Sequence, residues 1–292
     1  MQNGFLDIRS AMSDLLDPKG LPRSADFLEA NLDLIDRSNS DFKSFINTLF
    51  ETPFWATQDF LSNPFKKLCT KLADEVDRFA LTHTEPPYHS RSHFKDVCLM
   101  LSYLLLQQEV WPERVCVNNP WHVSREESWL LLYAAIAHDF AHPGLINQTP
   151  YEIEQNSLDL LRQHLLSSST DQSLYEEILG VVSPWILATD HAFYQYQLDR
   201  ASLAEPNHQD CLAMLLIEAD LLSSTLPKRG LDLTNQLSKE WQAHYPDKAI
   251  ALRNEVGYLS FLNSLEFLSP QALAAQIPQI LNNSVLQLRS RL

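Results

Sequence analysis

Two histidine pairs are the residues of this sequence whose types and spacing are best suited to chemistry. His89 and His93 lie four residues apart, and His138 and His142 have the same spacing. Residues at positions i and i+4 of a helix project from one face, so each pair could direct two imidazoles into one cavity. Imidazole is a common metal ligand, and the pattern therefore indicates a metal centre. A single pair of this kind more often marks a helix surface or a capped helix end.

Two carboxylates strengthen the case for a metal centre. Asp139 follows His138 directly, and Asp220 lies in an apolar stretch that runs from Leu215 to Leu222. An ionised aspartate in such a helix is costly unless a metal or an ion pair compensates its charge. Asp220 alone could be a buried helix-cap partner. Together with the two histidine pairs, the carboxylates suit Zn, Fe or Mn, with Mg where oxygen atoms and water predominate.

The remaining histidines and the cysteines lack a comparable context. The cysteines are scattered without paired spacing, which favours reduced, packed thiols over a disulfide framework or a zinc knuckle. These thiols are Cys69, Cys98, Cys116 and Cys211. The histidines expected to be ordinary surface or loop residues are His83, His122, His164, His208 and His244.

Composition and charge exclude several classes of protein. Hydrophobic residues make up 45% of the 292 positions and charged residues 20%, as in a folded domain. The net charge of -15 repels polyanions and argues against nucleic acid as a partner, but divalent ions could still attract a small anionic substrate. No apolar run approaches the ~20 residues needed to cross a bilayer. The amino terminus does not resemble a signal peptide, so we expect a cytoplasmic protein without membrane contact.

The elements that would position these side chains are predicted to be helices. The chain has only six glycines, and its leucine-rich stretches lack the punctuation that short strands need. Pro143 and Gly144 follow His142 directly and place the polar cluster at a helix end. We expect an all-α protein with a helical amino-terminal extension (residues 1–44) and a catalytic domain (residues 45–292). Helices are predicted over 65–81, 93–108, 126–138, 152–166, 174–189, 210–223, 232–244 and 249–268.

Four motifs resemble the catalytic domain of class I 3′,5′-cyclic nucleotide phosphodiesterases. Residues 88–97 read Tyr-His-Ser-Arg-Ser-His-Phe-Lys-Asp-Val, similar to the family signature Tyr-His-Asn-x-x-His-x-x-Asp-Val, with Ser90 in place of asparagine. Residues 138–147 match His-Asp-x-x-His-Pro-Gly-x-x-Asn. Leu-Ala-Thr-Asp recurs at 187–190, and Ala-Asp-Leu at 219–221. The motifs follow the order of the family and cover roughly residues 45–268, which implies a compact multi-helix fold of the HD and phosphodiesterase type.

The resemblance implies a role for each matching residue. The tight metal, Zn²⁺ or else Fe or Mn, would be held by His93, His138, Asp139 and Asp220. Asp139 would also bridge to a second, water-rich site for Mg²⁺ or Mn²⁺. His89 would be the general acid that protonates the departing 3′ oxygen. Waters of the second metal would be held by His142, Glu154 and Thr189, and the substrate would be contacted by Tyr88, Asn147, Glu255 and Tyr258.

The proposed specificity residues depart from the family. Glu255 stands where the family has a glutamine that binds the purine edge, and Tyr258 stands where it has a phenylalanine. A carboxylate only accepts hydrogen bonds, so Glu255 would favour guanine, which presents two adjacent donors, over adenine. Alternatively, Glu255 turns away to pair with a cation such as Arg253 or Arg229. The sequence leaves both readings open.

The leading hypothesis is a phosphohydrolase that converts a 3′,5′-cyclic nucleotide to the 5′-monophosphate. Two alternatives remain open: an enzyme acting on a nucleotide monophosphate or an unusual phosphodiester, and a catalytically silent sensor or interaction module stabilised by metal. The presence of His89 argues against the silent module, because a purely structural metal site needs no general acid. The expected partner is a small phosphoester, and nothing in the sequence indicates an oligomeric state.

Overall fold

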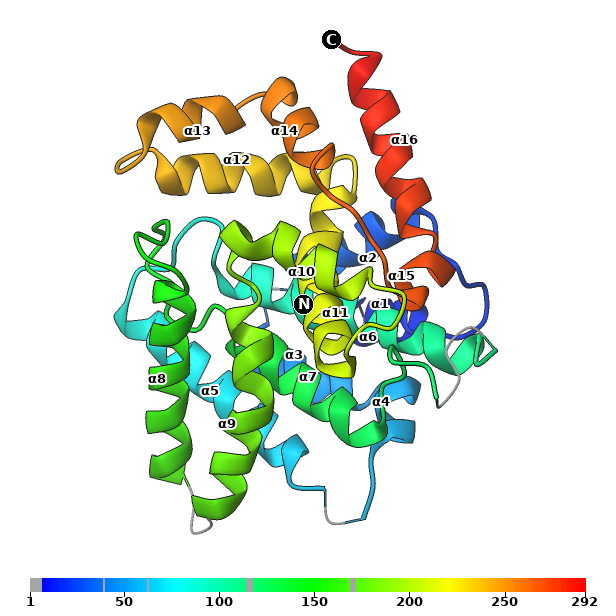
Figure 1. Ribbon diagram of the computed structural model, residues 1–292, viewed down its shortest axis with the longest axis vertical. Coiled ribbons are helices and arrows are strands. Elements are labelled where there is room, and N and C mark those ends of the chain that lie inside the picture. Colours follow the sequence, from blue (N-terminus) through cyan, green and yellow to red (C-terminus); the bar gives the residue numbers. More distant parts are fainter. Residues whose placement is uncertain (1–6, 39, 62, 114–117, 169–171) are drawn as a thin grey trace.

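The structure is a computed structural model that describes residues 7–38, 40–61, 63–113, 118–168 and 172–292. Its described residues form helices and loops and contain no β-strand (Figure 1), so the all-α prediction is confirmed. Cys116 lies outside the described residues, whereas Cys69, Cys98 and Cys211 are buried free thiols, as predicted. Within the described part of the chain, no helix combines the length and apolar character needed to cross a membrane.

The helices follow one another along the whole chain. They are α1 (Asp7–Leu15), α2 (Ala25–Arg37), α3 (Phe42–Phe50), α4 (Pro53–Gln58), α5 (Phe65–Thr82), α6 (Arg91–Val110), α7 (Arg125–Ala137), α8 (Glu152–Ser168), α9 (Gln172–Leu187), α10 (Tyr194–Ala201), α11 (His208–Leu222), α12 (Arg229–Trp241), α13 (Pro246–Leu252), α14 (Glu255–Leu262), α15 (Pro270–Ala274) and α16 (Ile277–Arg289). Two short 3₁₀ turns are η1 (His191–Phe193) and η2 (Ser223–Thr225).

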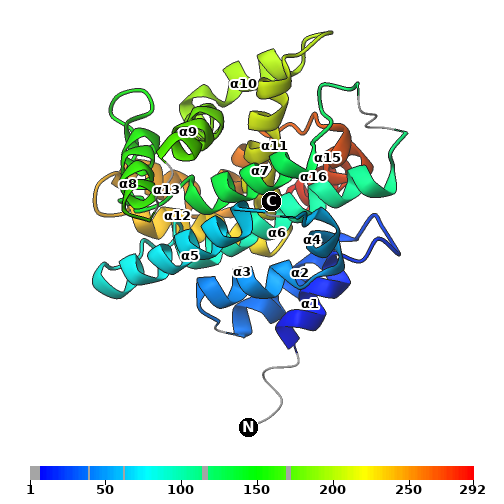
Figure 2. The same ribbon diagram turned by 90° about the horizontal axis from the view of Figure 1, so that it is seen from below.

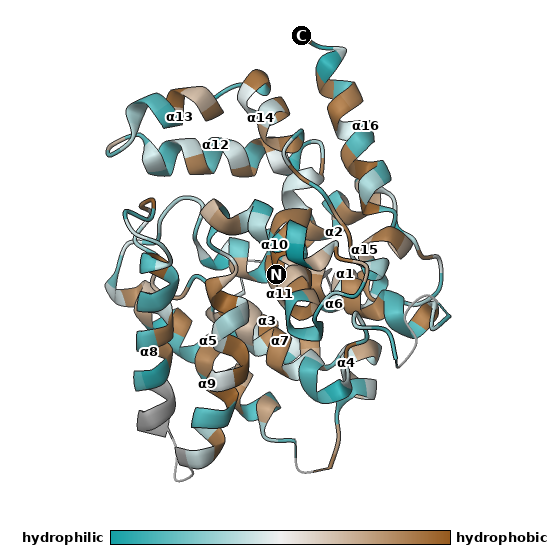
Figure 3. Cartoon of the chain, in the orientation of Figure 1, coloured by the Kyte–Doolittle hydropathy of each residue, from teal (hydrophilic) through white to brown (hydrophobic). Residues whose placement is uncertain are grey.

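Three helices, α6, α7 and α11, form the centre of the molecule. Their buried residues cover nearly the whole helix circumference, as expected of helices surrounded by other helices. Figure 3 shows hydrophobic residues concentrated on these elements. A capping box starts α7, because Ser124 Oγ accepts from Glu127 N at 3.3 Å and Glu127 Oε2 accepts from Ser124 N at 2.8 Å. The ends of these buried helices carry the predicted metal ligands.

The amino-terminal helices share the core of the remaining chain. Met12 and Leu15 of α1 and Leu28 and Leu32 of α2 are buried in one hydrophobic cluster with the central helices. Figure 2 shows α1, α2, α3 and α4 gathered on one side of the molecule, next to α5 and α6. Residues on both sides of position 45 therefore contribute to the same packed interior.

Helices α12, α13 and α14 form an arm across one side of the molecule; we refer to residues 229–262 as the arm (Figure 1). The single helix predicted for residues 249–268 is wrong, because the chain breaks between α13 and α14. Asn254 caps α14 by accepting from Gly257 N at 3.0 Å. A Cβ atom on Gly257 would lie 1.9 Å from the Ala251 carbonyl oxygen, so the close approach of α13 and α14 requires glycine.

Candidate metal centre and its pocket

Three of the four predicted metal ligands converge from three central helices. His93 lies in the first turn of α6, His138 is the C-cap of α7, and Asp220 lies in the last turn of α11. One ligand atom from each of these residues lies within 4.8 Å of the others. The helix ends thus bring together residues that are up to 127 positions apart in the sequence.

Asp139, the fourth predicted ligand, adds a carboxylate to the same cluster. Its Oδ2 atom lies 3.1 Å from His138 Nε2 and 3.4 Å from His93 Nε2. Asp220 Oδ1 lies 3.0 Å from His93 Nε2 and 3.9 Å from His138 Nε2. The cluster therefore consists of two imidazole nitrogens facing two carboxylate oxygens, a donor set that suits Zn²⁺, Fe or Mn.

The ligand atoms of this cluster fit a bound cation. His93 Nε2, His138 Nε2 and Asp220 Oδ1 are buried and have no hydrogen-bond partner in the described structure. Buried polar atoms without partners are rare, because each costs desolvation free energy. His138 Nδ1 lies 2.9 Å from the Ala135 carbonyl oxygen, which can only accept, so Nδ1 carries the proton and Nε2 is free to bind a metal.

The electrostatics of the cluster favour positive charge. Burial is the largest effect on the His93 imidazole and lowers its pKa, but the adjacent carboxylates of Asp139 and Asp220 outweigh it and raise the pKa to about 10. The pKa of His138 is raised by the same balance. The negative charge that stabilises a proton on these imidazoles would also stabilise a bound divalent cation. The residues present therefore fit the metal that the sequence implies.

His89, the predicted general acid, lies beside the ligand cluster and is bound on its other side by Glu240 of the arm. Its Nδ1 atom lies 2.6 Å from Glu240 Oε1, while Glu240 Oε2 accepts from the backbone nitrogens of Tyr88 at 2.9 Å and His89 at 3.2 Å. Burial opposes ionisation of Glu240, but these hydrogen bonds and the His89 charge outweigh it and lower its pKa. His89 Nε2 lies 4.0 Å from Asp139 Oδ2, and so the ring bridges the arm and the metal cluster.

The residues expected to hold waters of a second metal line a pocket of about 440 Å³ beside the ligand cluster. His142 stacks on His89 with ring centroids 3.5 Å apart, and burial followed by the His89 charge lowers its pKa to about 3. Glu154 Oε2 accepts from Asn147 Nδ2 at 2.8 Å, and burial raises the pKa of Glu154. Thr189 also lines the pocket. The structure therefore brings together His142, Glu154, Thr189 and the predicted substrate residues Tyr88 and Asn147.

A strained turn carries the chain from Asp139 to this pocket. Ala141 has φ 60°, in the left-handed region that costs a non-glycine residue about 1–2 kcal/mol. Gly144 has φ 72°, and a Cβ atom there would lie 3.0 Å from Glu240 Cγ. Strained backbone persists where the surrounding structure holds it in place, and it clusters at functional sites. Here the turn directs Asp139 and His142 toward the same pocket.

The predicted base-binding residues Glu255 and Tyr258 lie outside the pocket. Glu255 begins α14, and its Oε1 atom lies 3.4 Å from Arg291 Nη1. Tyr258 is fully buried, and its hydroxyl lies 2.9 Å from the carbonyl oxygens of Ser224 and Leu226. The predicted substrate contact is therefore corrected: the arm turns both side chains away, and the cation beside Glu255 is Arg291 in place of Arg253 or Arg229.

Other residues of the arm form the wall of the pocket opposite the metal cluster. They are Leu237, Trp241, Lys248, Leu252 and Phe261. Among the lining residues Lys248 is the one lysine or arginine. The sequence analysis missed these residues because an amphipathic helix pattern does not distinguish a pocket wall from an ordinary packing face.

The sequence analysis also missed Glu240 and His191. Glu240 meets His89 across 151 residues, and no local pattern marks that contact. His191 lines the pocket in η1, and Asp190 begins this turn by accepting from Ala192 N at 3.0 Å. Burial lowers the pKa of His191. The Leu-Ala-Thr-Asp motif that ends at Asp190 was the signal that could have drawn attention to the next residue.

Comparisons with known proteins give one relative in sequence and several in fold. No family model matches the chain. The chain is 28% identical over 234 residues to 3′,5′-cyclic-nucleotide phosphodiesterase 2 of Saccharomyces cerevisiae, an alignment that covers 70% of this chain and 43% of that protein. The chain thus spans less than half the length of this curated relative.

Two solved structures share the fold. LmjPDEB1 in complex with IBMX aligns with a TM-score of 0.62 at 15% identity and covers 98% of this chain and 96% of its own. The phosphodiesterase domain of the RhoPDE fusion protein from the choanoflagellate Salpingoeca rosetta aligns with a TM-score of 0.50 at 18% identity, over 84% of this chain and 97% of that domain. The predicted resemblance is confirmed: the chain has the all-α fold of phosphodiesterase catalytic domains.

Proposed function

We propose that this chain is a metal-dependent phosphohydrolase that converts a 3′,5′-cyclic nucleotide to the 5′-monophosphate. One observation carries the proposal. The unpartnered ligand atoms of His93, His138 and Asp220 meet Asp139, and the imidazole of His89 is held separately, with Nε2 4.0 Å from the Asp139 carboxylate. A cation site alone would not need this second, oriented imidazole.

The four proposed ligands have distinct positions in this reading. His93, His138 and Asp220 would hold the tight metal, Zn²⁺ or else Fe or Mn, and Asp139 would be shared with a second, water-rich site for Mg²⁺ or Mn²⁺. When bound, two such cations polarise the phosphate oxygens and lower the pKa of an attacking water. Asp139 suits the shared role because its Oδ2 atom lies within 4.0 Å of nitrogen atoms on both His89 and His93.

His89 would supply the proton to the departing 3′ oxygen. Glu240 engages Nδ1 and thereby leaves Nε2 as the nitrogen that faces the pocket. A buried carboxylate on the far side of an imidazole fixes its tautomer and stabilises its protonated form. Glu240 is accordingly proposed as the positioning residue for His89, with His142 stacked against the ring to restrict its rotation.

The second candidate is hydrolysis of a different small phosphoester. The pocket wall formed by the arm supports this second candidate. Neither Glu255 nor Tyr258 reaches the pocket, and the side chains of this wall are largely apolar. Such a wall would accept a planar base but does not select one by paired hydrogen bonds. Under either reading the partner is a small molecule, and we propose a cytoplasmic setting for the reaction.

Metal analysis combined with a substrate panel tests the proposal. The purified chain should contain transition metal and hydrolyse at least one cyclic nucleotide together with bis-p-nitrophenyl phosphate. Hydrolysis of the generic ester but of no cyclic nucleotide in the panel would favour the second candidate. Bound metal without turnover of either substrate would contradict both and favour a catalytically silent domain.

A further inference from the structure

The amino-terminal helix α2 caps the first turn of the arm. Lys228 and Arg229 begin α12, and no side chain of the helix itself caps this end. Instead, Glu29 of α2 accepts from Lys228 N at 2.6 Å and from Arg229 N at 3.0 Å. Glu29 is 6% exposed, and a carboxylate at a helix N-terminus is stabilised by the free amides and by the helix dipole. A residue 200 positions away therefore completes α12.

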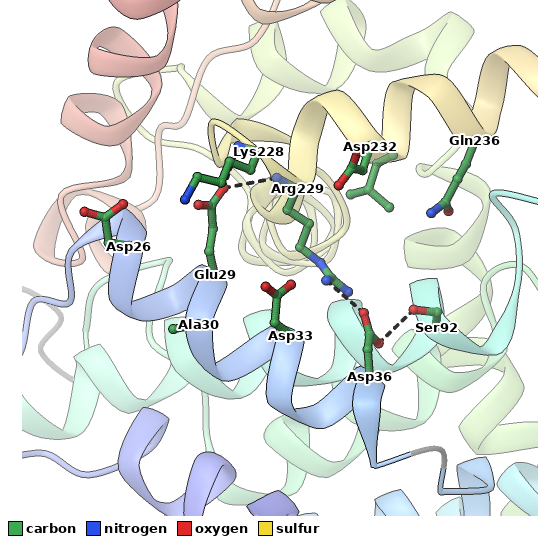
Figure 4. A pocket seen from close by; sticks show the side chains of 11 residues that line it. Asp26, Glu29, Ala30, Asp33, Asp36, Ser92, Lys228, Arg229, Asp232 and Gln236 are labelled. Atoms are coloured by element: carbon green, nitrogen blue, oxygen red, sulfur yellow. Dashed lines mark hydrogen bonds and ion pairs between the residues drawn. The ribbon is translucent and has the colours of Figure 1, made fainter.

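Arg229 joins this end of α12 to α6 and gives it a second contact with α2; Figure 4 shows the bond to Asp36 of α2. Its Nε and Nη2 atoms each donate to the buried carboxylate of Asp96 at 2.5 Å. Its Nη1 atom donates to Asp36 of α2 at 2.9 Å, and Asp36 also accepts from Ser92 Oγ of α6 at 3.0 Å. Asp96 and Ser92 flank the predicted metal ligand His93 on α6. The guanidinium thus ties the arm both to the ligand helix and to α2.

The other end of α12 holds the general acid. Glu240 lies in the last turn, eleven residues after Arg229, or about 16 Å along the axis. Between the two ends, α12 and its neighbour α13 line the pocket through Leu237, Trp241 and Lys248. Figure 1 shows α12 and α13 crossing above the body as a hairpin. The Arg229 contacts and the Glu240 contacts with residues 88 and 89 therefore fix opposite ends of one rod.

We infer that Glu29 and Asp36 are positioning residues for His89, which act through Arg229 and α12 on Glu240. A tilt of α12 by about 4° at its first turn would displace Glu240 by about 1 Å, given the helix length. Displacements of that size alter catalysis strongly. These two carboxylates of α2 would thus position the acid from outside the pocket. The inference rests on the proposed function of His89.

A comparison of two substrates tests this coupling. A cyclic nucleotide has an alkoxide leaving group that needs a proton, whereas p-nitrophenolate leaves bis-p-nitrophenyl phosphate without one. In Asp36→Asn and Glu29→Gln, the ratio of kcat/KM for the cyclic nucleotide to kcat/KM for the ester should fall about 10-fold, because the misplaced acid matters for one substrate alone. Asp33→Asn is the matched control: it lies on the same helix and cavity wall and is exposed like Asp36, but it pairs with Arg37 and not with Arg229. It should keep the ratio within about twofold.

Two outcomes would overturn the inference: equal losses of kcat/KM on both substrates, as expected from simple destabilisation, and no loss on either substrate in both variants. Arg229→Lys provides an independent variant that retains the charge but loses the fork to Asp96. It should show the same fall in the ratio. His89→Ala must show the largest fall in the ratio. If the ratio does not fall in His89→Ala, the proposed general acid is contradicted. If it falls in His89→Ala but not in the α2 variants, only the coupling fails.

Discussion

The two walls of the pocket differ in how they are built. The metal-cluster wall comes from the ends of α6, α7 and α11, which are buried on nearly all sides. The ligand atoms of His93, His138 and Asp220 face one another without hydrogen-bond partners. The opposite wall comes from the arm, which presents apolar side chains and one lysine. The first wall dictates a chemistry, while the second sets only the size and polarity of what is held. Under the proposed function, reaction type and substrate choice would therefore reside in different parts of the fold.

The largest expected effect comes from removing the shared carboxylate of the metal-cluster wall. Asp139→Ala should abolish bound metal and activity together, because the atoms around Asp139 Oδ2 include both ligand imidazoles and His89. Atomic emission measures the metal content, and hydrolysis of a cyclic nucleotide measures the activity. Asp159→Ala, an exposed carboxylate on α8, should change neither quantity. Full metal content in Asp139→Ala would show that the two halves of the cluster are not linked through this residue.

The general acid should show a smaller and more selective effect. His89→Ala is expected to retain its metal and lose roughly 10²- to 10⁴-fold in kcat on a cyclic nucleotide, the usual contribution of a positioned proton donor. The loss on bis-p-nitrophenyl phosphate should be much smaller. His191→Ala is the matched control, because His191 also lines the pocket but forms no hydrogen bond or ion pair with a carboxylate among the described residues. If His191→Ala showed the selective loss instead, the general acid would be His191 and the assignment to His89 would be contradicted.

Substitutions in the arm wall should alter substrate binding and leave metal content unchanged. Phe261→Ala removes an aromatic face from the pocket and should raise KM about 10-fold, since base–aromatic contacts contribute about 1–3 kcal/mol. The kcat should change little. Leu286→Ala, an exposed apolar residue of α16, is a control outside the pocket. A change in kcat with constant KM would indicate that the arm acts on chemistry at this position as well.

The smallest effect is expected at Glu255. Because it pairs with Arg291 outside the pocket, Glu255→Gln should leave the ratio of kcat/KM for guanine and adenine cyclic nucleotides unchanged, and stability should shift by less than about 1 kcal/mol. Steady-state kinetics on both nucleotides measure the ratio. A marked gain for adenine would mean that α14 turns toward the pocket when substrate binds.

The same contrast explains how much could be predicted from sequence. The metal cluster was predictable because His93, His138, Asp139 and Asp220 lie in short, recognisable motifs. The expectation that each histidine pair shares one helix face was wrong, since His89 precedes α6 and His142 follows the end of α7. The arm was not, since the contact between Glu240 and His89 depends on where a distant helix packs. The predicted helix over 249–268 failed because the cap at Asn254 and the close approach at Gly257 outweigh an apolar pattern. Tyr258 looked like a pocket residue, but its hydroxyl is bound by two backbone carbonyls.

The most direct test of the account is the position of the metal itself. An anomalous difference map from a crystal of the purified protein, recorded above the absorption edge of the metal found by emission analysis, should show a peak bounded by His93 Nε2, His138 Nε2 and Asp220 Oδ1. These three atoms are buried, lie in one cluster and have no hydrogen-bond partner among the described residues. A peak at that position would establish the metal centre. A map without a peak there, from protein that hydrolyses its substrate, would contradict the central claim.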